Sequence, residues 1–115
     1  MSATKPVLVL TAIGEAAMGV ALLIAPSLVS RLLLGAELTG VGTPIARVLG
    51  IALISLGIAC WPGPPRVGML TYSAGVMLYL AWLGLAVGTG GTLLWPAVIL
   101  HAILTALLLL APARP

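Results

Sequence analysis

Long apolar runs, separated by short clusters of proline, glycine and charged residues, follow one another along the chain. A helix needs about 20 apolar residues to cross a hydrocarbon core of about 30 Å. The runs that meet this length cover residues 6–25, 43–61, 67–87 and 93–111. The pattern therefore predicts an all-α polytopic membrane protein, a single transmembrane domain over residues 1–115 folded as an antiparallel bundle of four transmembrane helices.

Prolines mark the predicted helix ends. Pro6 and Pro44 fall in first turns, where a missing N–H leaves no helical hydrogen bond unmade, and Thr43 is a candidate N-cap. The Trp-Pro-Gly-Pro-Pro run at residues 61–65 cannot continue a helix. It predicts a tight turn between antiparallel neighbours.

The segment after the first span has two interpretations. It is longer than a hairpin turn requires, and it places Ser27, Ser30 and Arg31 among leucine and valine residues. One interpretation is a short amphipathic helix over residues 26–35 that lies along the membrane interface. The other is a continuation of the first helix with a kink at Pro26.

The composition indicates that lipid, and not water, surrounds most of the protein surface. Hydrophobic residues make up 62% of the 115 residues and charged residues 6%, with a mean hydropathy of +1.29. A water-soluble domain of this size could not cover itself with so few polar groups. Glu15 and Glu37 are the only acids of the sequence, which leaves few groups for acid–base catalysis. No catalytic residue is assigned.

The net charge of +3 comes from basic residues near the segment ends, not from a basic patch, so nucleic acid is not an expected partner. These residues are Lys5, Arg31, Arg47, Arg66 and Arg114. Lys5, Arg66 and Arg114 share one predicted side with both termini and no acid, whereas Arg31 and Arg47 share the other side with Glu37. The positive-inside rule therefore predicts cytoplasmic N- and C-termini.

Small residues form stripes on two of the predicted spans. Ala46, Gly50 and Gly57 follow one face of the second span, and Gly84 and Gly88 form a G-x-x-x-G pair on the third. Such stripes let membrane helices approach closely. We expect these faces to pack the helices of one chain, with a homo-oligomer or a larger membrane complex as the alternative.

Two spans share a short similarity. Residues 19–23 read Gly-Val-Ala-Leu-Leu and residues 50–54 read Gly-Ile-Ala-Leu-Ile, on helices predicted to run in opposite directions. Inverted repeats occur in transporters. Five apolar matches in a chain so rich in leucine, alanine and glycine are explained by chance.

Glu15 is the polar residue that the pattern explains least. It lies about 15 Å along the first span, near the predicted midplane, where an acid costs on the order of 3 kcal/mol on insertion scales. Thr11 and Gly19, one turn to either side, make a small, partly polar face that predicts an inward orientation. Arg47 has two interpretations: it pairs with Glu15 across an offset of roughly 9 Å, or it extends to the headgroups.

His101 in the fourth span and Tyr79 in the third fall at levels similar to those of Glu15 and Arg47. These four residues form a predicted polar cluster with two interpretations. One is an interhelical hydrogen-bonded contact, and the other is a proton relay or a ligand-binding site. One histidine and one cysteine do not make a zinc site, and His101 alone offers a single axial haem ligand, so neither a metal nor a cofactor is predicted.

The second span carries Arg47, Gly50, Leu53 and Gly57 in an R-x-x-G-x-x-L-x-x-x-G pattern. This pattern resembles a helix of DoxX-like small four-helix membrane proteins, whose function is poorly defined. It implies a bacterial inner-membrane protein, in some cases associated with redox or quinone-linked partners. It assigns no catalytic residue.

Three functions follow from these observations. The leading hypothesis is a non-enzymatic accessory or scaffold protein that binds membrane partners, or copies of itself, through its glycine-lined faces. The first alternative is a proton or small-solute carrier or channel that uses Glu15, Arg47 and His101. The second is a membrane enzyme for a lipophilic small molecule, with Glu15 and His101 as acid and base.

Overall fold

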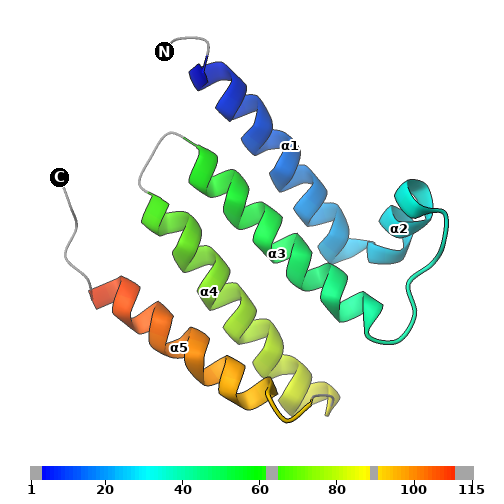
Figure 1. The fold of residues 1–115 in the computed structure, drawn as a ribbon, viewed down its shortest axis with the longest axis vertical. Helices are drawn as coiled ribbons and strands as arrows, with labels where there is room; N and C mark the ends of the chain where they lie inside the picture. Colours follow the sequence, from blue (N-terminus) through cyan, green and yellow to red (C-terminus); the bar gives the residue numbers. More distant parts are fainter. Residues whose placement is uncertain (1–3, 62–64, 89–90, 111–115) are drawn as a thin grey trace. The chain divides into compact units, whose positions relative to one another are not determined.

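The computed structural model describes residues 4–61, 65–88 and 91–110, and these residues form helices and their connections. The elements in chain order are α1 (Thr4–Ile24), α2 (Pro26–Leu34), α3 (Gly42–Cys60), α4 (Pro65–Trp82), the π-helical turn η1 (Leu83–Val87) and α5 (Leu94–Leu110) (Figure 1). No strand occurs within these ranges, so the predicted all-α class is confirmed.

Three helical segments are long and apolar enough to cross a membrane. They cover Pro6–Ile24, Gly42–Cys60 and Pro65–Val87, the last of which joins α4 to η1. The fourth predicted span corresponds to α5, an apolar helix of 17 residues over Leu94–Leu110. A membrane protein is therefore indicated by three candidate spans, with α5 as a shorter apolar helix.

The chain divides into two compact units, Met1–Gly68 and Met69–Pro115. In the first unit α1 and α3 lie side by side and run in opposite directions (Figure 1). Their contact is made at glycines: a Cβ atom on Gly57 would lie 2.8 Å from the carbonyl oxygen of Ala12. The small-residue stripe of α3, with Ala46 and Gly50 also buried, therefore packs against α1 within the chain.

The connection from α1 to α2 is set by Pro26. The residue before a proline is disfavoured in the α region, and Ala25 leaves the helix with φ −137° and ψ 65°. The chain resumes as α2, which ends at Gly35 in the left-handed conformation (φ 82°), with its N–H donated to the carbonyls of Ser30 and Arg31. A separate helix thus follows the first span, and its position at a membrane interface stays a prediction.

In the second unit α4 passes through η1, and the chain returns as α5. Gly84 lies where the two helices meet, since a Cβ atom there would be 2.7 Å from side-chain atoms of both Leu94 and Trp95. Gly88 has a different role from the helix packing that was predicted. It takes a left-handed conformation (φ 76°) and ends η1, with its N–H donated to the carbonyl of Leu83, and no described atom lies within 4 Å of an added Cβ.

Candidate functional site

Glu15 lies in the middle of α1, on the edge of its contact with α3. Helical geometry rotates its side chain by about 60° from that of Ala12 and about 40° from the position of Gly19, both of which are buried. Glu15 itself is half-buried. Its neighbour Thr11 turns back onto α1, where its hydroxyl donates to the carbonyl of Val7 at 2.8 Å.

The Glu15 carboxyl group has no hydrogen-bond or ion-pair partner among the residues that the structure describes. An ion pair does form between Arg31 and Glu37, with Nε and Oε2 3.8 Å apart, but these side chains are 53% and 64% exposed. Such exposed pairs contribute little to stability. Glu15 is therefore an acid at mid-helix depth whose hydrogen-bonding capacity is unused.

Arg47 binds the end of α1. Its Nε donates to the carbonyl oxygen of Leu23 at 3.3 Å. Leu23 lies in the last turn of α1, where carbonyls lack a helical N–H partner. A cation at this end also interacts favourably with the helix dipole. Arg47 thus acts as a side-chain cap for α1.

The observed partner of Arg47 is therefore Leu23 and not Glu15. Leu23 follows Glu15 by eight residues, which corresponds to about 12 Å along the helix axis. The expected offset of roughly 9 Å allowed Arg47 to reach Glu15, but its side chain binds the carbonyl at the end of α1 instead. The predicted ion pair between Arg47 and Glu15 is therefore not formed.

The polar groups of α5 are largely bound to their own helix. His101 Nδ1 lies 2.8 Å from the carbonyl oxygen of Ala97, and the Thr105 hydroxyl donates to the carbonyl of His101 at 2.7 Å. A carbonyl oxygen only accepts, so Nδ1 carries the hydrogen of this contact. In the neutral ring Nε2 then keeps its lone pair, and it is the atom of His101 that can accept a proton or a hydrogen bond.

The aromatic partner of His101 is Tyr72, which sequence reasoning did not select. The two ring centroids are 5.9 Å apart at an interplanar angle of 66°, an edge-to-face contact. Tyr79 instead stacks on Trp82 of its own helix, with centroids 6.0 Å apart. The signal in the sequence was that Tyr72 and Tyr79 are seven residues apart and share a helix face.

The predicted four-residue cluster is distributed over both units. Glu15 and Arg47 belong to the first unit, and Tyr79 and His101 belong to the second. A cluster contributed by all four helices therefore stays a prediction. The same holds for the hypothesis that Glu15 and His101 act together as acid and base.

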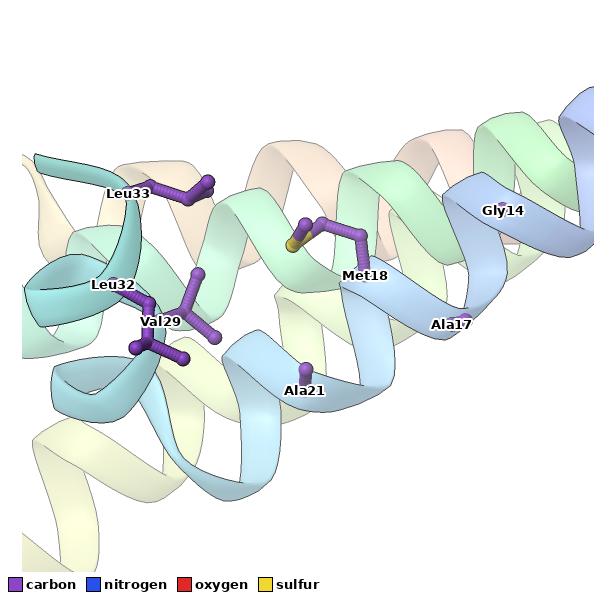
Figure 2. Close-up of a pocket in the computed structure, with 7 residues that line it drawn as sticks. All are labelled: Gly14, Ala17, Met18, Ala21, Val29, Leu32 and Leu33. Carbon is purple, nitrogen blue, oxygen red and sulfur yellow. The ribbon is translucent and has the colours of Figure 1, made fainter.

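An apolar groove of about 360 Å³ runs between α1 and α2 (Figure 2). Its lining comprises Gly14, Ala17, Met18 and Ala21 of α1 and Val29, Leu32 and Leu33 of α2. The side chains of Met18 and Leu33 extend over it from opposite helices (Figure 2). The sequence signal for this groove is the set of small residues on α1 at positions 14, 17 and 21. The wall contributed by α2 depends on the turn at Pro26.

Over the residues that the structure describes, these features define an all-helical protein with candidate membrane-spanning helices, an unpaired acid in the middle of α1 and an apolar groove between α1 and α2. Within the described ranges, no three His, Cys, Asp or Glu side chains gather as ligands for one metal ion. No family model, curated protein or solved structure matches the chain.

Proposed function

We propose that this chain is a four-span protein of the bacterial inner membrane, with both termini in the cytoplasm, and that it carries protons or a small solute by means of Glu15. The length of α5 supports a fourth span, because an apolar helix of 17 residues lies at the lower limit of what crosses a bilayer. The distribution of basic residues supports the orientation. The DoxX-like pattern of the second span supports the membrane assignment.

The unpaired carboxyl group of Glu15 is the observation that carries this proposal. An acid inside a membrane is costly and is found paired or lining a pathway. Here α3 packs closely against α1 at its glycines, and its Arg47 side chain donates a hydrogen bond to the Leu23 carbonyl. Glu15 is consequently free to take up a proton or a cation, which is the elementary step of a carrier.

The glycine-lined faces favour this function over a scaffold that binds partners through them. Gly50 and Gly57 contact the α1 backbone, and Gly84 contacts α5 residues. These faces are thus already used in packing within each unit. Packing within the first unit also explains the R-x-x-G-x-x-L-x-x-x-G pattern of the second span. Its Arg47, Gly50 and Gly57 each contact α1.

An accessory or scaffold protein is the second candidate function, and Glu15 gives it a specific basis. A neutral carboxyl group on a lipid-facing helix can be satisfied by hydrogen bonds to another membrane helix. The partner would be a second copy or a subunit of a larger complex. In this function Glu15 holds an assembly together, and its ability to release a proton is irrelevant.

Two substitutions of Glu15 separate these functions. Glu15→Gln keeps the size and hydrogen-bonding capacity but removes the proton that the carboxyl group exchanges, whereas Glu15→Leu removes both. We would reconstitute each protein in sealed vesicles, measure proton flux with an internal pH-sensitive dye under an imposed membrane potential, and measure association by energy transfer between labelled copies.

A carrier is expected to lose proton flux in both variants, with association unchanged in Glu15→Gln. Flux that is equal in the wild-type protein and Glu15→Gln, or absent from both, would overturn the proton-carrier proposal. Association that persists in Glu15→Gln and is lost in Glu15→Leu, without any flux that depends on Glu15, would establish the scaffold.

A further inference from the structure

Arg47 is a basic residue whose hydrogen-bonding capacity the fold uses only in part. Its Nε donates to the carbonyl oxygen of Leu23 at 3.3 Å. A guanidinium group carries further N–H donors on both of its Nη atoms, and these have no hydrogen-bond or ion-pair acceptor among the residues that the structure describes. Arg47 is half-buried, and unpaired donors are costly to bury. These N–H groups therefore require an acceptor from another molecule.

The hydrogen bond to Leu23 fixes the level of the guanidinium group. Leu23 is next to Ile24, which ends the candidate span Pro6–Ile24, and Arg47 lies about 7.5 Å along α3 from its first residue, Gly42. Because α1 and α3 run in opposite directions (Figure 1), the end of α1 and the start of α3 lie on the same side of a membrane. The guanidinium group is thus held where hydrocarbon gives way to lipid headgroups.

Phosphate is the headgroup acceptor that fits a guanidinium group best. Its oxygens can accept two parallel N–H groups from the planar fork of an arginine, and the opposite charges strengthen both hydrogen bonds. The bond from Nε to Leu23 leaves the N–H groups of both Nη atoms for such a contact. It also holds the side chain in one place, which lowers the conformational entropy that binding would cost.

The charge of Arg47 favours a lipid with a net negative charge. Glu15 and Glu37 are the only acids of the sequence. Glu37 is paired with Arg31, and Glu15 lies about 12 Å from Leu23 along the axis of α1. No carboxylate of the described residues therefore balances Arg47. The phosphate of a zwitterionic lipid is balanced by its own ammonium group, whereas that of an anionic lipid is not.

We propose that Arg47 binds the phosphate group of an anionic phospholipid at the membrane interface where α1 ends and α3 begins. The site does not include Glu15, so it is independent of the proposed carrier function. Thr43 provides a second polar contact. It lies one turn before Arg47 on α3, rotated by about 40°, and its half-buried side chain has no hydrogen-bond partner among the described residues.

The probe is short-chain phosphatidylglycerol, with phosphatidylcholine of the same chain length as the zwitterionic comparison. We would titrate each lipid into the full chain in neutral detergent micelles and measure the dissociation constant by thermophoresis. An attraction of about 1 kcal/mol between a basic residue and an anionic lipid corresponds to about a fivefold change in affinity. The wild-type protein is therefore expected to bind phosphatidylglycerol about fivefold or more tightly than phosphatidylcholine.

The variants distinguish a site at Arg47 from a general attraction between charges. Arg47→Gln is expected to abolish the preference for phosphatidylglycerol. Arg31→Gln is the matched control, because it removes the same charge on the same predicted side of the membrane, and it is expected to keep the preference within about twofold. Thr43→Val has the shape of threonine without the hydroxyl group, leaves the bond from Arg47 to Leu23 in place, and is expected to weaken phosphatidylglycerol binding by about twofold or more.

Four results would overturn the inference. The first is equal affinity of the wild-type protein for the two lipids, which requires no variant. The second is an equal loss in Arg47→Gln and Arg31→Gln, with circular dichroism showing both variants folded. The third is unchanged binding in Thr43→Val together with a preference that survives in Arg47→Lys, which keeps the charge but not the planar fork. The fourth is displacement of the lipid by inorganic phosphate but not by chloride of equal ionic strength, which would assign the site to a free anion. Glu15→Gln is expected to bind the lipid as the wild-type protein does, so loss of the carrier function would leave this site standing.

Discussion

Gly19 and Gly50 face each other across the contact between α1 and α3. A Cβ atom on Gly19 would lie 2.5 Å from the carbonyl oxygen of Gly50, and one on Gly50 would lie 2.7 Å from the carbonyl oxygen of Gly19. The contact is therefore reciprocal and involves backbone on both sides. Gly19 and Gly50 are also the first residues of the similar segments at 19–23 and 50–54, and the contact accounts for that one shared position, whereas the other four matches stay explained by chance.

Gly19→Ala is expected to destabilise the protein. The added methyl group meets backbone and Ile54 atoms at distances that real Cβ atoms do not tolerate, so the helices must move apart. Overpacking of this kind typically costs about 1–3 kcal/mol. The measurement is the free energy of unfolding of the protein in mixed micelles, followed by circular dichroism.

Gly14→Ala is the matched control for that substitution. Gly14 lies on the same helix, and no atom of the described residues lies within 4 Å of an added Cβ there. Alanine is favoured over glycine in helices by about 1 kcal/mol, so this variant is expected to be as stable as the wild-type protein or more stable. Equal destabilisation by both substitutions would show that Gly19 does not mark the closest approach of α1 and α3.

Arg47→Gln is expected to destabilise the first unit through loss of the α1 cap. Hydrogen bonds made by charged groups contribute about 1.5–3 kcal/mol, and removal of Arg47 leaves the Leu23 carbonyl without its partner. Arg31→Gln removes the same charge from an exposed pair and should cost at most about 1 kcal/mol. Chemical unfolding of the two variants gives the comparison, and a larger effect of Arg31→Gln would contradict the capping role.

Local signals predicted the helices better than they predicted the partners of individual side chains. The turn at Pro26 and the start of α3 near Pro44 follow from the proline ring and backbone sterics, which act within a few residues. The partner of Arg47 depends on the register between α1 and α3, and that register is set by where glycines let backbones approach. Single-sequence periodicity placed Tyr79 and Tyr72 on one face but could not tell which of them meets His101.

A double-mutant cycle between Tyr72 and His101 tests that last contact. Edge-to-face aromatic pairs contribute about 0.5–1.5 kcal/mol beyond their burial, so the substitutions Tyr72→Leu and His101→Leu are expected to be non-additive in unfolding free energy by about this amount. The cycle between Tyr79 and His101 serves as the control. Coupling that is larger for Tyr79 than for Tyr72 would show that the wrong tyrosine has been paired with His101.

The single cysteine provides a test of orientation that needs no engineered label. Cys60 ends α3, next to the turn that is predicted to share the cytoplasmic side with both termini. In right-side-out vesicles a membrane-impermeant thiol reagent should therefore leave Cys60 unmodified until the membrane is permeabilised. The complementary variant Cys60→Ser/Thr39→Cys places the thiol in the exposed connection between α2 and α3, where it should react without permeabilisation. The reverse pattern would invert the proposed topology, and it would place α2 on the cytoplasmic side.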